Sequence, residues 1–290
     1  MMDEQPLQMG FANFEEWNRF NQRFPEYVQR YGSIDAMRGT VFQRRAVGAR
    51  VDRVIFGLGW SAFEDFQQIN LLCGNGYGIG AMQILRGMYE RVVVAAYLSR
   101  HPQDVDDFLD FDYVQRRKGL NNLRRLYQGN DLDRVVSPDR QREIEDEYQN
   151  AKRDGRFTEV LCDVCNKVRD TISWTRLSMP DLARRGGREL DIFLFPIYIK
   201  PTLLSHASLY SLMARMRDNP DGGFSFDAEG QRAQVEPALQ HAHFLLVHMF
   251  GTQNDHFHLG ADDQLQALLD DYRACWRHEP PTDAEPVETF

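Results

Sequence analysis

The sequence predicts an all-α protein, folded as a single multi-helix bundle. Apolar residues recur at helical spacing along the 290-residue chain, and strand signals are nearly absent. With 42% apolar and 12% aromatic residues, the chain can bury a sizeable core. We expect one helical domain over residues 1–278, in which residues 1–32 form an N-terminal helical arm. A disordered tail, rich in acidic residues and proline, is expected over residues 279–290.

The N-terminal part of the chain predicts an aromatic, charged helical segment followed by longer helices. The first segment is expected to break at Gly32 and Ser33, where Ser33 would cap the next helix. Residues 34–72 predict either one long helix or two helices in series. Gly57 and Gly59 are the candidates for a kink within this stretch.

The helix predicted over residues 81–98 is apolar almost all round, yet it contains Arg86 and Glu90. The glycines of CGNGYGIG predict a turn before this helix, and Pro102 predicts its end. A helix without a polar face belongs in the centre of a bundle, so we expect both charged side chains to be mostly buried. Residues four apart share a helix face and can pair. Because a buried charge costs several kcal/mol unless it is paired and hydrogen-bonded, other polar groups should surround this pair.

Caps and charges predict the remaining helices. A segment with an acidic start and a basic second half follows the proline, an order that suits the helix dipole. Ser137 is expected to cap the next helix, and residues 178–181, SMPD, have the spacing of a capping box that opens a short helix. Two further helices are expected over residues 193–216 and 231–250.

Three segments, in this order, resemble an uncharacterised bacterial family, a domain of unknown function. The segments are GYGIGAMQILRGMYERVVVAAYLSRHP, SWTRLSMPDLARRGG and YIKPTLLSHAS. The matching residues are Arg86, Glu90, Trp174, Tyr198 and the Ser205–His206 pair, which is adjacent here where the family pattern separates Ser and His. The chain is also similar in general architecture to the HEPN-type helical proteins. Many of those are metal-independent ribonucleases of bacterial antiviral defence and toxin systems, so this likeness implies an endoribonuclease.

The same residues support a chemical hypothesis. An arginine can stabilise charge that develops on a phosphate, and a histidine can act as general acid or base near neutral pH. We therefore predict a site for phosphodiester cleavage that uses no metal and no cofactor. Its predicted catalytic residues are Arg86, Glu90 and His206, and its predicted substrate-binding residues are Ser205, Tyr198 and Trp174. The alternative is a non-catalytic helical module that binds a protein partner or a small ligand, in which this cluster is purely structural.

Three other patterns favour structural interpretations. Five of the eight histidines lie within residues 241–258, but their spacing matches no established metal signature, which favours a helix end with partly exposed histidines. The CDVC segment at residues 162–165 has no second cysteine pair and is expected to place two buried thiols on one helix. Arg273 and His278 have the Arg-x4-His spacing of HEPN ribonucleases, although His278 adjoins the proline-rich tail.

The net charge of −9 argues against a protein that coats nucleic acid, although the clusters RRKGLNNLRR and ARRGGRE could contact phosphates. The four cysteines are too scattered for a disulfide framework, and the N-terminal residues lack a signal-peptide pattern. No uncharged apolar run approaches the roughly 20 residues that a membrane span requires. We expect a cytoplasmic protein without a membrane span. Its expected partners are RNA, a second copy in a homo-oligomer, or an operon-encoded protein.

Overall fold

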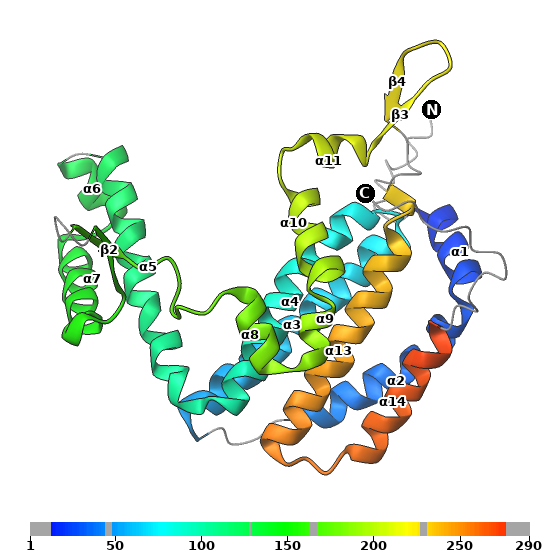
Figure 1. Ribbon diagram of the computed structural model, residues 1–290, viewed down its shortest axis with the longest axis horizontal. Coiled ribbons are helices and arrows are strands. Elements are labelled where there is room, and N and C mark those ends of the chain that lie inside the picture. Colours follow the sequence, from blue (N-terminus) through cyan, green and yellow to red (C-terminus); the bar gives the residue numbers. More distant parts are fainter. Residues whose placement is uncertain (1–12, 44–47, 128, 163–166, 227–230, 277–290) are drawn as a thin grey trace, which may run out of the picture. The chain divides into compact units, whose positions relative to one another are not determined.

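The computed structural model describes residues 13–43, 48–127, 129–162, 167–226 and 231–276 (Figure 1). The predicted all-α class is confirmed, because helices dominate and only four short strands are present in these ranges. The chain forms two compact units, one from residues 1–100 and 182–290 and the other from residues 101–181. The single folded domain over residues 1–278 stays a prediction. The expected tail at residues 279–290 and the first part of the N-terminal arm lie outside the described residues.

Three long helices form the centre of the first unit: α3 (Arg50–Gly74), α4 (Gly78–Arg100) and α13 (Val235–Phe257), which pack against one another. Helices α1 (Phe14–Arg23), α2 (Pro25–Val41) and α14 (Asp262–Cys275) pack around them (Figure 1). The prediction of a helix over residues 81–98 is confirmed. Its side chains at Leu85, Met88 and Val92 are fully buried, as expected of a central helix.

The turn between α3 and α4 follows the local sequence. Gly76 has a φ of +80°, a backbone conformation that glycine adopts without strain. Gly78 begins α4 against the turn that precedes α13, where an added Cβ would lie 2.3 Å from the Gln231 carbonyl oxygen. Only glycine permits this close approach of two backbones. At the other end, α4 stops at Arg100, before Pro102 as predicted.

The predicted break at Gly32 and Ser33 is wrong, because α2 runs through both residues. The Ser33 hydroxyl donates to the Arg30 carbonyl oxygen and also bonds Asp271 of α14, so it connects two helices and caps none. Of the two arrangements considered for residues 34–72, the structure has two helices in series. Gly59 lies inside the uninterrupted α3, where its missing side chain makes room for the buried Gln253.

Short elements complete the first unit. The helix predicted over residues 193–216 is broken: Ser208 caps a new turn, its hydroxyl accepting a hydrogen bond from the Ser211 N–H at 3.3 Å. Two prolines, Pro196 and Pro201, lie in the preceding turns and remove backbone donors there. The elements in this part are α8 (Met179–Gly186, which begins in the second unit), α9 (Arg188–Ile192), the π-helical turn η3 (Phe195–Ile199), α10 (Lys200–Ser205), α11 (Leu209–Met213), β3 (Met216–Asp218) and β4 (Phe224–Phe226).

The second unit is built on helices with an antiparallel strand pair. Ser137 caps α7 as predicted, and Ser178 and Asp181 form the predicted capping box of α8. The small core consists of Phe111, Val114, Tyr148, Ala151 and Phe157. Its elements are η1 (Pro102–Asp104), α5 (Val105–Leu126), α6 (Asn130–Val135), α7 (Pro138–Ala151), η2 (Arg153–Gly155), β1 (Thr158–Cys162) and β2 (Lys167–Asp170).

The helix predicted for the CDVC segment is wrong, because Cys162 ends strand β1. Residues 163–166, which include Cys165, lie outside the described residues. Among the helices that the structure describes, none combines the length and the apolar character that crossing a bilayer requires.

Candidate functional site

Arg86 and Glu90 form the expected ion pair, with 3.3 Å between Arg86 Nε and Glu90 Oε1. Their side chains are 33% and 40% exposed, so both are mostly covered but keep access to solvent. Gln83 and Gly87 precede them at helical spacing and are also incompletely covered. The central helix therefore keeps a narrow exposed strip, and the pair lies on it.

Tyr198 joins this pair. The Arg86 guanidinium carbon lies 5.3 Å from the centre of the Tyr198 ring, within the range of a cation–π contact. That ring lies 5.7 Å from the ring of Tyr89, whose hydroxyl donates to the Leu190 carbonyl oxygen at 2.8 Å. The structure thus brings three of the six predicted site residues together, because η3 and α10 pack on α4.

The expected packing of the segment that carries Ser205 and His206 on α4 is confirmed, since α10 contacts α4. A contact between these side chains and the Arg86–Glu90 pair, direct or through one water, stays a prediction. The Ser205 hydroxyl donates to the Pro201 carbonyl oxygen at 2.7 Å, and His206 lies exposed just past the end of α10. Within the described ranges, no hydrogen bond joins Ser205 or His206 to Arg86 or Glu90. Of the three predicted catalytic side chains, Arg86 and Glu90 are therefore hydrogen-bonded to each other, and His206 has no direct hydrogen bond to either.

Trp174 belongs to the second unit. Its ring packs edge-on against Phe108 at 5.5 Å, and it covers the small core of that unit. Its predicted role in substrate binding stays a prediction.

The histidines of α13 are more buried than the expected exposed helix end. His243 is fully buried, and its Nδ1 accepts a hydrogen bond from Trp276 Nε1 at 3.1 Å. Burial lowers the pKa of His243 and of His241 to about 4, and nearby Lys200 also lowers the pKa of His241. Burial likewise lowers the pKa of His248. These side chains are neutral near pH 7.

The structure shows no metal site at the histidines and no Arg-x4-His site at Arg273 within the described residues. No group of three potential metal ligands occurs within the described residues. At the end of α14, Arg273 pairs with Asp270 at 2.9 Å on the surface, and His278 lies outside the described residues.

A charged pair that was not predicted joins two of the central helices. Arg91 donates to Asp65 at 2.5 Å and so connects α4 to α3. Burial raises the pKa of Asp65 to about 6, although Arg91 acts in the opposite direction. The sequence shows Arg91 beside Glu90 in an apolar helix, but nothing in the sequence identifies its partner on another helix.

The orientation of the apolar side chains near α11 is a feature that the sequence did not predict. Within α11, Ser211 is buried while Leu209 and Met213 face outward. Strand β4 repeats this inversion, because two exposed phenylalanines flank a half-buried serine. We call the exposed apolar residues of this segment the apolar surface: Ile192, Phe195, Ile199, Leu203, Leu209, Tyr210, Leu212, Met213, Phe224 and Phe226.

Comparison with known proteins identifies a family. A family model described as a family of unknown function, DUF5677, matches residues 52–224. No curated protein and no solved structure matches the chain. The likeness to HEPN-type proteins therefore stays an expectation. Because the family match covers more than half of the chain, the protein belongs to DUF5677, a family of unknown function.

Proposed function

We propose that the protein is a non-catalytic helical module that binds a protein partner through the apolar surface, and that this partner is a second copy of the chain. The inverted helix α11 carries the proposal. This five-residue helix buries a serine and exposes four large apolar side chains. Contact of these side chains with water is unfavourable in free energy unless another surface covers them.

The segment is held in this arrangement by its own hydrogen bonds. The Ser211 hydroxyl donates to the Leu204 carbonyl oxygen at 3.0 Å and thereby ties α11 to α10. Arg215 donates to both the carbonyl and the hydroxyl oxygen of Ser211 and ties α11 to the chain that enters β3. Because the buried serine serves as the anchor, the apolar side chains around it are left to face outward.

The extent of the apolar surface suits a stable interface. Its ten side chains expose on the order of 1,000 Å², since each offers ~150–250 Å² in full and about half of that is exposed. A standard interface buries about 800 Å² on each partner. The surface also lies almost entirely within the residues that the family model matches, as expected of a feature that relatives share.

Charge favours a second copy as the partner. Residues 192–216 contain no acidic side chain, and their basic side chains are Lys200, His206 and Arg215. The chain as a whole carries −9, so two copies repel each other over most of their surfaces and least at this one. A nearly uncharged surface can face itself across a two-fold axis without placing many like charges together.

Sedimentation equilibrium tests the proposal. The wild-type protein should be a dimer at micromolar concentration, and Leu209→Glu should make it a monomer, because the carboxylate would be desolvated in the interface. Leu126→Glu is the matched control: Leu126 is 74% exposed and Leu209 72%, but Leu126 lies on α5, outside the apolar surface. A wild-type protein that stays monomeric at 100 µM, a concentration of about ten times a typical weak-dimer Kd, would contradict a second copy as the partner.

The ribonuclease hypothesis remains as a second candidate function. Its support is Arg86, which presents a half-exposed guanidinium beside Tyr198, together with the exposed imidazole of His206. Glu90 would complete the predicted catalytic set. A role in antiviral defence, an operon-encoded partner and a cytoplasmic location belong to this proposal, as the sequence suggested. Incubation with mixed RNA at neutral pH, with His206→Ala as the control, tests it: cleavage that the variant loses supports the enzyme, and intact RNA contradicts it.

A further inference from the structure

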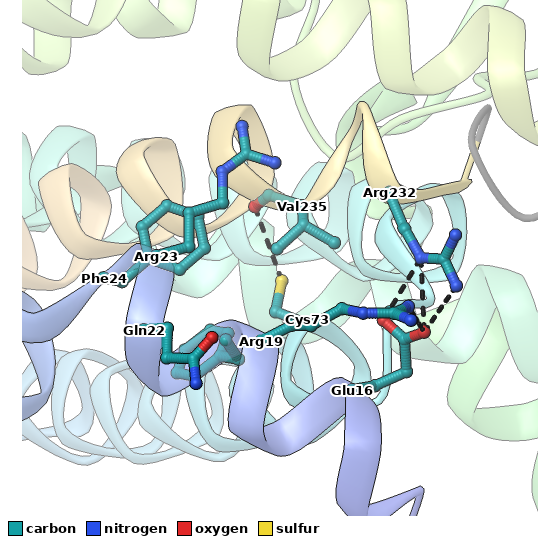
Figure 2. A pocket seen from close by; sticks show the side chains of 10 residues that line it. Glu16, Arg19, Gln22, Arg23, Phe24, Cys73, Arg232 and Val235 are labelled. Atoms are coloured by element: carbon teal, nitrogen blue, oxygen red, sulfur yellow. Dashed lines mark hydrogen bonds and ion pairs between the residues drawn. The ribbon is translucent and has the colours of Figure 1, made fainter.

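A hollow of about 350 Å³ lies where α1 meets the end of α3 and the start of α13 (Figure 2). This volume falls within the usual range of small-molecule sites, about 300–1,000 Å³. The hollow belongs to the first unit, and none of the apolar-surface residues lines it. A ligand here would thus be independent of the proposed interface.

The floor of the hollow is apolar and well ordered by packing. Phe20 of α1 and Phe24, the residue just after α1, form one wall with ring centres 5.2 Å apart. Cys73 and Val235 form the base, where the thiol contacts the Val235 carbonyl oxygen at 3.6 Å. Burial raises the pKa of the Cys73 thiol far above its ordinary value, so it stays protonated and serves as an apolar wall.

The rim of the hollow is cationic. Arg19, Arg23 and Arg232 line it together with one acidic residue, Glu16, so the lining carries a formal charge of +2 in a chain of −9. Figure 2 shows the Arg19 and Arg232 guanidinium groups gathered at the Glu16 carboxylate, with Arg23 standing apart from them near Phe24. Glu16 accepts from Arg19 at 2.7 Å and from Arg232 at 2.5 Å.

These ion pairs organise the arginines and leave the rim with one excess positive charge, because three arginines pair with two carboxylates. The buried Glu16 carboxylate is held by two guanidinium groups, which lower its pKa and keep it ionised. Arg23 pairs with Glu236 of α13 at 2.6 Å, with its side chain 53% exposed. A guanidinium has five N–H donors and a single carboxylate engages only some of them, so an arginine fixed by one carboxylate can also bind an incoming anion.

We propose that this hollow binds a small amphipathic anion, with its apolar body against Phe20, Phe24 and Val235 and its carboxylate or phosphate group at the arginine rim. Tight binding at this site requires both the apolar body and the anionic group of the ligand. An ion without an apolar body leaves the floor uncovered, and an apolar molecule without charge leaves the arginines unused.

Isothermal titration calorimetry on the full chain tests the ligand class with three probes. Octanoate should bind saturably, with a Kd of about 1 mM or tighter, as expected for a ligand of ten heavy atoms. Octanol, which has no charge, and inorganic phosphate, which has no apolar body, should each bind at least tenfold more weakly. Equal binding of octanol or of phosphate, or no saturation by octanoate, overturns the proposal.

Substitutions at Gln22 test the location of the site. Gln22 is exposed, lines the hollow and is not part of its ion pairs. Gln22→Glu should weaken octanoate binding about three- to fivefold at low salt, and Gln22→Lys should strengthen it by a similar factor. Gln83→Glu makes the same change at an exposed glutamine of α4 away from the hollow and should have no effect. A response at Gln83 equal to that at Gln22 contradicts the assigned location.

Arginine substitutions provide a second matched comparison. Arg19 pairs with Glu16 three residues earlier at 2.7 Å, and Arg38 pairs with Asp35 in the same spacing at the same distance, but only Arg19 lines the hollow. Arg19→Gln should therefore weaken octanoate binding, and Arg38→Gln should not. Leu209→Glu should leave binding unchanged, which separates this site from the apolar surface. Octanoate affinity that falls in Leu209→Glu but not in Arg19→Gln would place the ligand on the apolar surface and overturn the proposal.

Discussion

At the scale of single residues, exposure determines what Arg86 and Glu90 can do. A half-exposed pair keeps part of its hydration, so it neither costs what a buried pair costs nor stabilises the fold strongly. The same exposure leaves Arg86 open to an anion, which a fully buried guanidinium would not be. The contact with Tyr198 restricts the guanidinium to one side of the helix.

Glu90→Gln should therefore lower the free energy of unfolding by less than about 1 kcal/mol, the range measured for exposed ion pairs. Urea denaturation at pH 7 measures this change. A loss of about 3–5 kcal/mol would instead indicate a buried structural pair, because it is the cost of leaving a buried charge without its partner. Such a result would restore the interpretation that the sequence first suggested for Arg86 and Glu90.

At the scale of elements, the sequence predicts well those helices that local chemistry determines. The capping residues Ser137 and Ser178 and the stop before Pro102 lie where their hydrogen bonds and backbone restrictions require. The predicted helix boundaries are wrong where a contact with another element determines the local structure. Ser33 lies within α2 because Asp271 of α14 gives its hydroxyl a partner, and this contact is 238 residues away in the sequence.

The candidate site shows the same limit. Helical spacing placed Arg86 and Glu90 on one face, and the structure confirms their pairing. The exposure of α11 could not be predicted, because an apolar residue on a short helix looks the same in sequence whether a core or a partner molecule covers it. The anchoring of Ser211 on Leu204 and Arg215 is a tertiary detail that turns the helix outward.

Helix α13 carries a pH dependence of stability. Burial holds the pKa of His241 and His243 at about 4 in the folded protein, below the ordinary value of 6.5. The unfolded chain therefore binds more protons between these values, so the stability present above pH 6.5 is lost as the pH falls toward 4. At pH 5 each of the two histidines should cost about 2 kcal/mol relative to pH 8.

Asp65 opposes this trend. Its pKa of about 6 lies above the ordinary value of 3.8, so the folded state binds the extra proton and gains stability as the pH falls through 6. The net loss of stability on going from pH 8 to pH 5 should be at least about 2–3 kcal/mol, because His241 and His243 outweigh one carboxyl group and the lowered pKa of His248 acts in the same direction. Urea denaturation at the two pH values measures it, with the exposed His206→Gln as a control that should not change the difference. Equal stability at both values would contradict the buried, neutral histidines.

At the scale of the whole molecule, the family match and the packing divide the chain differently. The match begins within α3 and ends in β4, yet α13, which lies beyond it, packs against both α3 and α4 in the core of the first unit. The matched residues alone would expose the faces of α3 and α4 that α13 covers. In this protein, the residues that the family model matches therefore complete their core with a helix from outside the match.

The two candidate functions differ in how the whole molecule should respond to salt. Two copies that each carry −9 repel each other, and raising the salt from 0.1 M to 1 M shortens the screening length from about 10 Å to about 3 Å. Association through the apolar surface should therefore stay constant or tighten over this range, since burial of apolar side chains needs no charge. Binding to RNA through arginines should weaken by orders of magnitude, because salt opposes the release of counterions that drives this binding.

Sedimentation equilibrium of the protein alone and filter binding of labelled RNA, measured over the same salt series, distinguish the two candidate functions. A dimer that dissociates as salt rises would show that ion pairs, and not the apolar surface, hold the two copies together.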